Sequence, residues 1–84
     1  MKKRSNENNC EYTTTDLGLS AALLTVGFEL VSLNKQNPNK VVFIFSRKTG
    51  IDKTIKSYWN GDLKVDAQGY FNAIKRLKNQ IYSG

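Results

Sequence analysis

The sequence predicts a small α+β domain in which an antiparallel β-hairpin packs against three helices, in the order α-β-β-α-α. Apolar residues recur at steps of three and four in three segments, which is the period of an amphipathic helix. β-branched and aromatic residues gather instead in residues 28–34 and 41–46, as they do in strands. A polar turn, KQNPNK, separates these two runs, so the simplest pairing is a hairpin.

The chain has 84 residues, enough for one domain, and the start of that domain is expected at residue 13. Residues 1–12 are polar, rich in Asn and without a hydrophobic period, which predicts a disordered basic tail. Residues 13–84 then form a single compact domain. Because so short a chain buries only about 60–65% of its unfolded surface, every large apolar side chain matters to its stability.

The first helix is expected in the segment TTTDLGLSAALLTVG. Thr14 or Thr15 can cap it, and Asp16 then lies in the first turn, where a carboxylate interacts favourably with the helix dipole. The small side chains of SAA at its centre would let another element approach closely. Gly27 suits the left-handed conformation that commonly ends a helix.

The hairpin is expected to join FELVSLN to VVFIFS. The second of these strands has five consecutive apolar residues, Val41 to Phe45, so it should be the central strand and should need cover on both faces. Two arrangements would supply that cover. Helices sandwich the hairpin, or its second face or free edge pairs with a second copy, so that the domain dimerises through the sheet.

The second helix is expected in TGIDKTIKSYWNG, with Thr49 as its cap and Asn60-Gly61 as its end. Tyr58 and Trp59 cannot both point inward from one narrow helix face, so one of them should lie at a rim or an interface.

The third helix is expected to begin after Asp66, which caps it, and to run through AQGYFNAIKRLKNQIYSG. Its predicted core stripe consists of Tyr70, Phe71, Ile74, Leu77 and Ile81.

A resemblance covers about residues 12–82. The pattern T-x-D-L-x-L-x-A-x-L runs from Thr14 to Leu23, followed by Gly27 and by V-x-F-x-F from Val41 to Phe45. Together with the later YWNGDLKVD and YFNAIKRLKNQIY, this pattern resembles a family of short uncharacterised proteins of bacteria and phages. That family is a domain of unknown function. That resemblance implies a compact single domain and an association with phages or mobile elements. It implies no catalytic residues.

The charge of the chain favours an anionic partner. Thirteen Lys and Arg residues against seven Asp and Glu give a net charge of +6, and most of it lies after the tail. DNA or RNA is the commonest partner of a small basic domain. Two clusters could contact phosphate, one of Lys75, Arg76 and Lys78 and the other of Arg47, Lys48, Lys53 and Lys56. The alternative for both clusters is a solvated surface that keeps the domain soluble.

Catalysis is not expected. The chain has no His, the commonest general base and metal ligand, and its single Cys10 lies in the predicted tail. One Cys without His cannot make a zinc site, and no Gly-rich phosphate loop occurs. Asp16 and Asp66 are expected at the starts of helices rather than as a pair of metal ligands. We therefore expect no enzyme activity, no metal and no small-molecule cofactor.

A cytoplasmic location without a membrane partner is expected. The longest apolar runs have about five residues, far fewer than the roughly 20 that span a bilayer. No apolar segment follows the basic MKKRSNENNC, so a secretory signal is not expected. The single Cys10 agrees with a reducing compartment.

Two functions follow from these features. The first is a small non-enzymatic nucleic-acid-binding accessory protein. The second is a protein-interaction module, either a homodimer or a phage-type modulator of a host protein, whose interface would include the hairpin edge, Trp59 and Tyr82.

Overall fold

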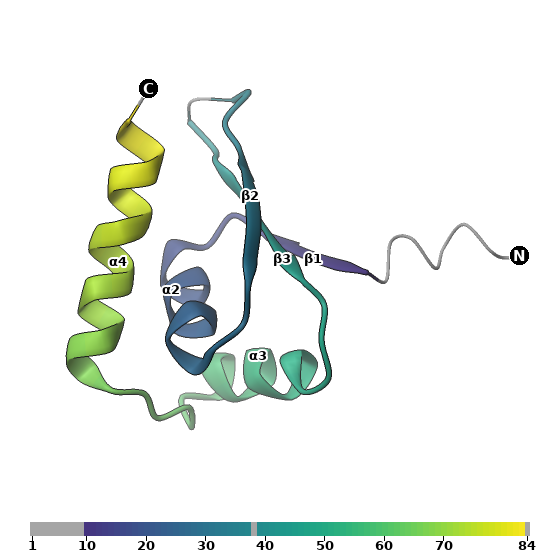
Figure 1. Ribbon diagram of the computed structural model, residues 1–84. Helices are drawn as coiled ribbons and strands as arrows, with labels where there is room; N and C mark the ends of the chain where they lie inside the picture. Colours follow the sequence, from purple (N-terminus) through teal and green to yellow (C-terminus); the bar gives the residue numbers. More distant parts are fainter. Residues whose placement is uncertain (1–9, 38, 84) are drawn as a thin grey trace, which may run out of the picture.

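A computed structural model describes residues 10–37 and 39–83 (Figure 1). Its elements are β1 (Glu11–Thr14), α2 (Leu17–Val26), β2 (Leu30–Asn34), β3 (Val42–Ser46), α3 (Ile51–Asn60) and α4 (Ala67–Tyr82). The predicted α+β class is confirmed, as are the antiparallel hairpin and the three helices. The order is β-α-β-β-α-α, because a strand precedes the first helix.

The additional strand corrects the predicted extent of the tail. Glu11 and Tyr12, expected in the tail, begin β1, which pairs antiparallel with β3 and sets Tyr12 opposite Phe45. Strand β1 reads EYTT. Tyr and Thr favour strands, but the segment is short and contains one large apolar side chain, so it lacks the hydrophobic period that marks a half-buried strand. Pairing with β3 and packing of Tyr12 against the core make it a strand. Residues 1–9 of the predicted tail lie outside the described residues.

The sheet has the strand order β1-β3-β2, and both pairings are antiparallel. The prediction that VVFIF supplies the central strand is therefore confirmed. Its free edge, which a second copy was expected to occupy in one of the two arrangements, pairs with β1 of the same chain. A β-bulge at Val31 lets Leu30 and Leu33 oppose Phe45 and Phe43.

The two faces of β3 have different environments. Phe43 and Phe45 are buried, whereas Val42 and Ile44, on the opposite face, are half-buried. All three helices lie on the Phe43 side of the sheet (Figure 1). On the other face, Ile44 is flanked by Thr13 of β1 and Ser32 of β2, and in the described part of the chain no helix covers them. Helices thus supply the expected cover for one face, and dimerisation through the sheet stays a prediction.

Helix α2 is the centre of the domain. Every residue from Leu19 to Leu23 is at most 1% exposed, because α2 lies between the sheet and α4 with α3 at one end (Figure 1). A helix apolar on all sides is buried on all sides. The small residues at its centre allow α4 to pack closely against it. Buried Ser20 donates from Oγ to the Asp16 carbonyl at 2.8 Å, which satisfies its hydroxyl.

The helix ends follow local chemistry. The N-cap of α2 is Asp16, whose carboxylate accepts from the Leu19 N–H at 2.7 Å. The expected cap at Thr14 or Thr15 is wrong, because Thr14 lies in β1 and its Oγ1 accepts from the Asp16 N–H at 3.1 Å. Gly27, with φ 119°, ends α2 as predicted.

Similar contacts bound the other two helices. Asp66 caps α4 as predicted, accepting from the Gly69 N–H at 2.7 Å. For α3 the N-cap is Gly50, not Thr49, with a positive φ of 93° that favours glycine. Gly61 ends α3 with φ 81°, as predicted.

Candidate nucleic-acid interface

A stripe of aromatic and lysine side chains runs along the outward side of α4. Phe71, Lys75, Lys78 and Tyr82 recur at steps of four, three and four, which places them on one side of the helix. All four are exposed, Phe71 by 60% and Tyr82 by 81%. We call these four residues the aromatic–lysine stripe.

The prediction that Phe71 belongs to the core is wrong. The buried side of α4 is centred on Ala73 and Leu77, and Phe71 lies about 120° around the helix from Leu77. Four apolar residues, Tyr70, Ile74, Leu77 and Ile81, already fill the side that faces the rest of the domain. The outward position of Phe71 adds a second aromatic ring, besides Tyr82, to the lysines.

Within the stripe, Lys75 is held against Phe71. Its Nζ lies 5.3 Å from the centroid of the Phe71 ring, a cation–π contact of about 0.5–1 kcal/mol at an exposed site. This contact presents a charge and an apolar ring side by side on the surface.

The predicted cluster of Lys75, Arg76 and Lys78 is divided between two flanks of α4. Arg76 lies on the flank near α2, where it lines a hollow of about 200 Å³ with Asn72 and Thr25. Lys75 and Lys78 lie about 100° or more away around the helix, in the aromatic–lysine stripe. Lys75 and Lys78 thus share one stripe and Arg76 points away from it, as the helical period predicts.

A larger hollow, of about 350 Å³, lies at the C-terminal end of the stripe. We call it the turn hollow, because the β2–β3 turn forms one of its sides. Its lining comes from the start of α2, from the turn and β3, and from the end of α4: Thr15, Leu17, Asn39, Lys40, Val41, Phe43, Ile81 and Tyr82. Lys40 is thereby added to the candidate cations. No local sequence pattern predicts this hollow, because its walls come from three separate segments.

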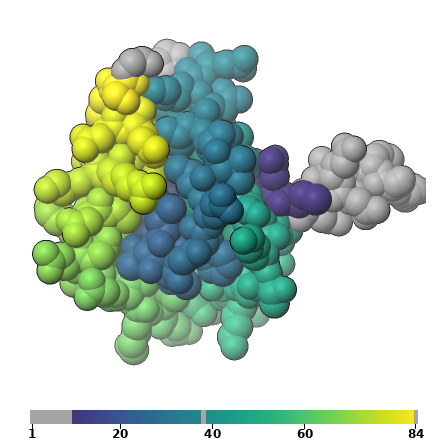
Figure 2. Space-filling view, viewed as in Figure 1, coloured from purple at the N-terminus to yellow at the C-terminus, as the bar shows by residue number. Residues whose placement is uncertain are grey.

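Lys35 fixes the end of α4 against the end of β2. Its Nζ donates to the carbonyls of Gln80 and Ser83, each at 3.0 Å. Figure 2 shows the last turns of α4 packed alongside this part of the chain. A lysine that binds the final carbonyls satisfies groups that would otherwise lack an intrahelical partner. Because Tyr82 lies between Gln80 and Ser83 in the chain, the two hydrogen bonds from Lys35 also set the position of Tyr82.

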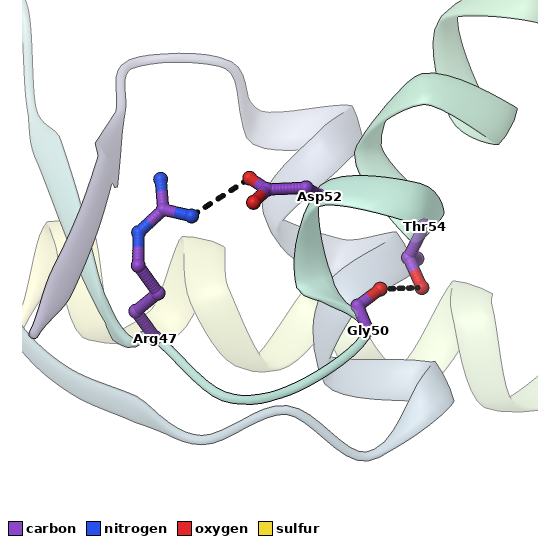
Figure 3. Close-up of polar contacts among 4 residues, drawn as sticks. All are labelled: Arg47, Gly50, Asp52 and Thr54. Atoms are coloured by element: carbon purple, nitrogen blue, oxygen red, sulfur yellow. Dashed lines mark hydrogen bonds and ion pairs between the residues drawn. The ribbon is translucent and has the colours of Figure 1, made fainter. Parts of the chain in front are cut away.

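One cation of the second predicted cluster, Arg47, takes part in contacts that hold the fold together. Arg47 Nη1 lies 2.7 Å from Asp52 Oδ1 in an ion pair that joins the end of β3 to the first turn of α3 (Figure 3). The Arg47 guanidinium also lies 5.8 Å from the centroid of the Tyr12 ring. Lys48, Lys53 and Lys56 are exposed. Arg47 is thus the cation of this cluster with the strongest structural role.

Trp59 lies at the surface and is 60% exposed, while its neighbour Tyr58 is half-buried against the core. Their rings meet edge to face with centroids 4.9 Å apart. The prediction that one of the two lies at a rim is confirmed.

Two tyrosines hold the three helices together at the start of α2. Tyr70 donates from its hydroxyl to the Gly18 carbonyl at 3.2 Å. A Cβ atom at Gly18 would lie 2.5 Å from the Tyr58 hydroxyl, so only glycine allows this close approach. Burial raises the pKa of Tyr58, and the Asp16 carboxylate and the Tyr70 hydroxyl raise it further.

Across residues 10–37 and 39–83, no three His, Cys, Asp or Glu side chains come together in a way that could hold a metal ion. No helix in the same residues has the length and apolarity needed to cross a membrane.

A comparison with known protein families shows to which family the chain belongs. The family DUF5659 matches residues 9–83, almost the whole protein. The chain belongs to the DUF5659 family. This is a domain of unknown function, in agreement with the resemblance seen in the sequence. The DUF5659 match begins ahead of β1 and so includes it in the domain. No curated protein and no solved structure matches the chain.

Proposed function

We propose that this DUF5659 domain is a small, non-enzymatic, nucleic-acid-binding accessory protein that contacts its ligand through α4. The observation that carries the proposal is the aromatic–lysine stripe, which exposes two rings and two cations on one side of a single helix. Its cytoplasmic location and its association with a phage or mobile element stay predictions from the sequence.

The composition of the stripe fits both parts of a nucleic acid. Lysine ammonium groups attract phosphate oxygens, and their attraction does not depend on base sequence. Exposed aromatic rings stack on bases. The net charge of +6 adds long-range attraction toward a polyanion. Phe71 and Tyr82 are 60% and 81% exposed, so their rings are accessible for such stacking.

The other predicted cations have supporting roles in this proposal. Arg76 and Asn72, on the neighbouring flank of α4, would extend the contact surface with groups that bind phosphates or base edges. Lys48, Lys53 and Lys56 would add to the general positive field. Arg47 would contribute least, because its guanidinium is engaged by Asp52.

The test is a binding titration against salt with single-stranded and double-stranded DNA and RNA. The double variant Lys75→Gln/Lys78→Gln should bind more weakly, and its slope of log affinity against log salt should fall by about 1.4–1.8, the loss of two phosphate contacts. The matched control, Lys53→Gln/Lys56→Gln, removes the same charge from α3 and should change the slope less. Absence of binding by the unmodified protein at low salt contradicts the function. Equal losses in the two variants contradict the site.

A protein-interaction module is the second candidate. It is favoured by the face of the sheet opposite the helices, where Val31 is 50% exposed and Val42 and Ile44 are half-buried. Trp59 adds a second exposed aromatic surface on α3. A homodimer or a partner protein would cover such apolar side chains.

A further inference from the structure

We infer that the preferred ligand is single-stranded nucleic acid and that one of its unpaired bases enters the turn hollow beside Tyr82. This inference rests on the nucleic-acid binding proposed above and specifies the form of the ligand. It is carried by the turn hollow, which lies at the end of the aromatic–lysine stripe and shares Tyr82 with it.

The interior of the turn hollow suits the flat face of a base. Leu17, Val41, Phe43 and Ile81 give it apolar walls. Its volume of about 350 Å³ falls within the range of roughly 300–1,000 Å³ that is usual for small-ligand sites. A base placed against these walls would leave water without losing hydrogen bonds from its ring faces, because those faces make none.

The rim of the turn hollow supplies polar groups for the rest of a nucleotide. Thr15 and Asn39 carry a hydroxyl and an amide, which can both donate and accept hydrogen bonds at a base edge. Lys40 lies on the same rim, and Lys78 lies one helical turn before Tyr82. These two cations would meet the phosphates on either side of the inserted base.

The turn that carries Asn39 and Lys40 is held by its own hydrogen bonds. The Asn39 N–H donates to Asn37 Oδ1 at 3.0 Å, and the Lys40 N–H donates to the Asn37 carbonyl at 3.0 Å. On the opposite side, Lys35 holds the end of α4 through the carbonyls of Gln80 and Ser83. Both sides of the hollow are therefore formed before a ligand arrives, which lowers the entropic cost of binding.

The two exposed rings favour a single strand. Phe71 and Tyr82 are separated by three helical turns, or about 16 Å at about 1.5 Å per residue, so they would meet two different bases. In a duplex the faces of these bases are stacked on one another, so neither ring could reach them without unpairing, whereas in a single strand they are accessible.

Three probes at one salt concentration separate this inference from the proposed function. They are a thymidine single strand of about ten nucleotides, within the roughly 4–16 nucleotides of known single-strand sites, an abasic strand with the same backbone, and a duplex of the same length. The single strand should bind about 5- to 150-fold more tightly than the abasic strand, the effect of losing a stacked base. It should also bind more tightly than the duplex. Equal binding of all three overturns the inference and leaves nucleic-acid binding intact, and binding of none overturns both.

Variants then test the position of the base. Tyr82→Ala should weaken the preference for the single strand over the abasic strand by about 5-fold or more, the loss of one stacked base, and Tyr82→Phe should keep it, because the ring remains. Thr15→Trp should fill the turn hollow and have the effect of Tyr82→Ala. Its control, Thr13→Trp, adds the same side chain to the opposite face of the sheet and should bind normally. A preference that survives both Tyr82→Ala and Thr15→Trp, with the fold verified by circular dichroism, overturns the placement.

Discussion

At the scale of single residues, the start of α2 shows how a small side chain and two tyrosines fix the positions of three helices. Gly18 lets the Tyr58 hydroxyl approach the α2 backbone, and Tyr70 bonds the Gly18 carbonyl from α4. Burial among these groups favours the neutral phenol of Tyr58 over its phenolate, which is the cause of its raised pKa. The shift has a direct consequence for stability.

The free energy of unfolding should fall as the pH rises above the ordinary tyrosine pKa. Because the folded state holds the Tyr58 proton more tightly than the unfolded state does, its contribution is complete below the unfolded pKa of about 10 and is lost as the pH rises through the folded pKa. Tyr58→Phe should reduce this slope by at most about 1.4 kcal/mol per pH unit, the effect of one proton. Urea unfolding measured between about pH 8 and pH 11 checks it, on either side of that value.

The same substitution, Tyr to Phe, at an exposed position provides the control for this prediction. Tyr82→Phe removes a hydroxyl from a side chain that is 81% exposed and should retain the pH dependence of the unmodified protein. A Tyr58→Phe variant with the unmodified slope would show that Tyr58 does not contribute.

At the scale of elements, α4 combines two tasks on opposite sides. Its inward side packs Ala73 and Leu77 into the core, and its outward side presents the aromatic–lysine stripe. The position of its last turn depends on Lys35, which comes from a different element.

Lys35→Met should loosen the last turn of α4. The variant keeps a long apolar side chain but removes the bonds to the Gln80 and Ser83 carbonyls, which at an exposed helix end are worth about 0.3–1 kcal/mol. Hydrogen exchange of the Ser83 amide, which donates to the Asn79 carbonyl at 2.9 Å, should become faster. Lys64→Met, in the exposed connector before α4, is the control. Unchanged exchange at Ser83 would contradict a capping role.

At the scale of the whole molecule, the helices are all on one side of the sheet (Figure 1). The opposite face is polar at Thr13 and Ser32 and apolar at Val42 and Ile44, with Val31 exposed at the bulge of β2. Short polar flanking strands reduce the apolar area that water meets, which is one way in which a sheet limits association.

If the domain is a homodimer through this face, light scattering should give twice the mass of the 84-residue chain, and Val31→Lys should lower the dimer fraction. A buried lysine without a partner is costly, which is the reason for the expected loss. Gln36→Lys adds the same charge in the exposed turn and should leave the dimer fraction unchanged. A monomer at every concentration contradicts dimerisation.

Features that depend on residues within one helical turn or one strand could be predicted from the amino-acid sequence. Asp66 as a cap, Gly27 and Gly61 as helix ends and the apolar run of β3 follow from interactions between near neighbours in the chain. The α+β class follows from the order of the helices and strands along the chain. The candidate contact cations on α4 could also be named, because their spacing on a helix is fixed by its period.

Features that require distant segments to meet could not be predicted from the sequence and became apparent in the folded structure. Strand β1 has one large apolar residue and becomes a strand because β3 offers it an edge. Phe71 faces outward because α2 and the sheet fill the other side of α4. The turn hollow exists because three segments converge at one place. The free energy of these contacts comes from packing between residues far apart in the chain, so no local pattern of the sequence encodes them.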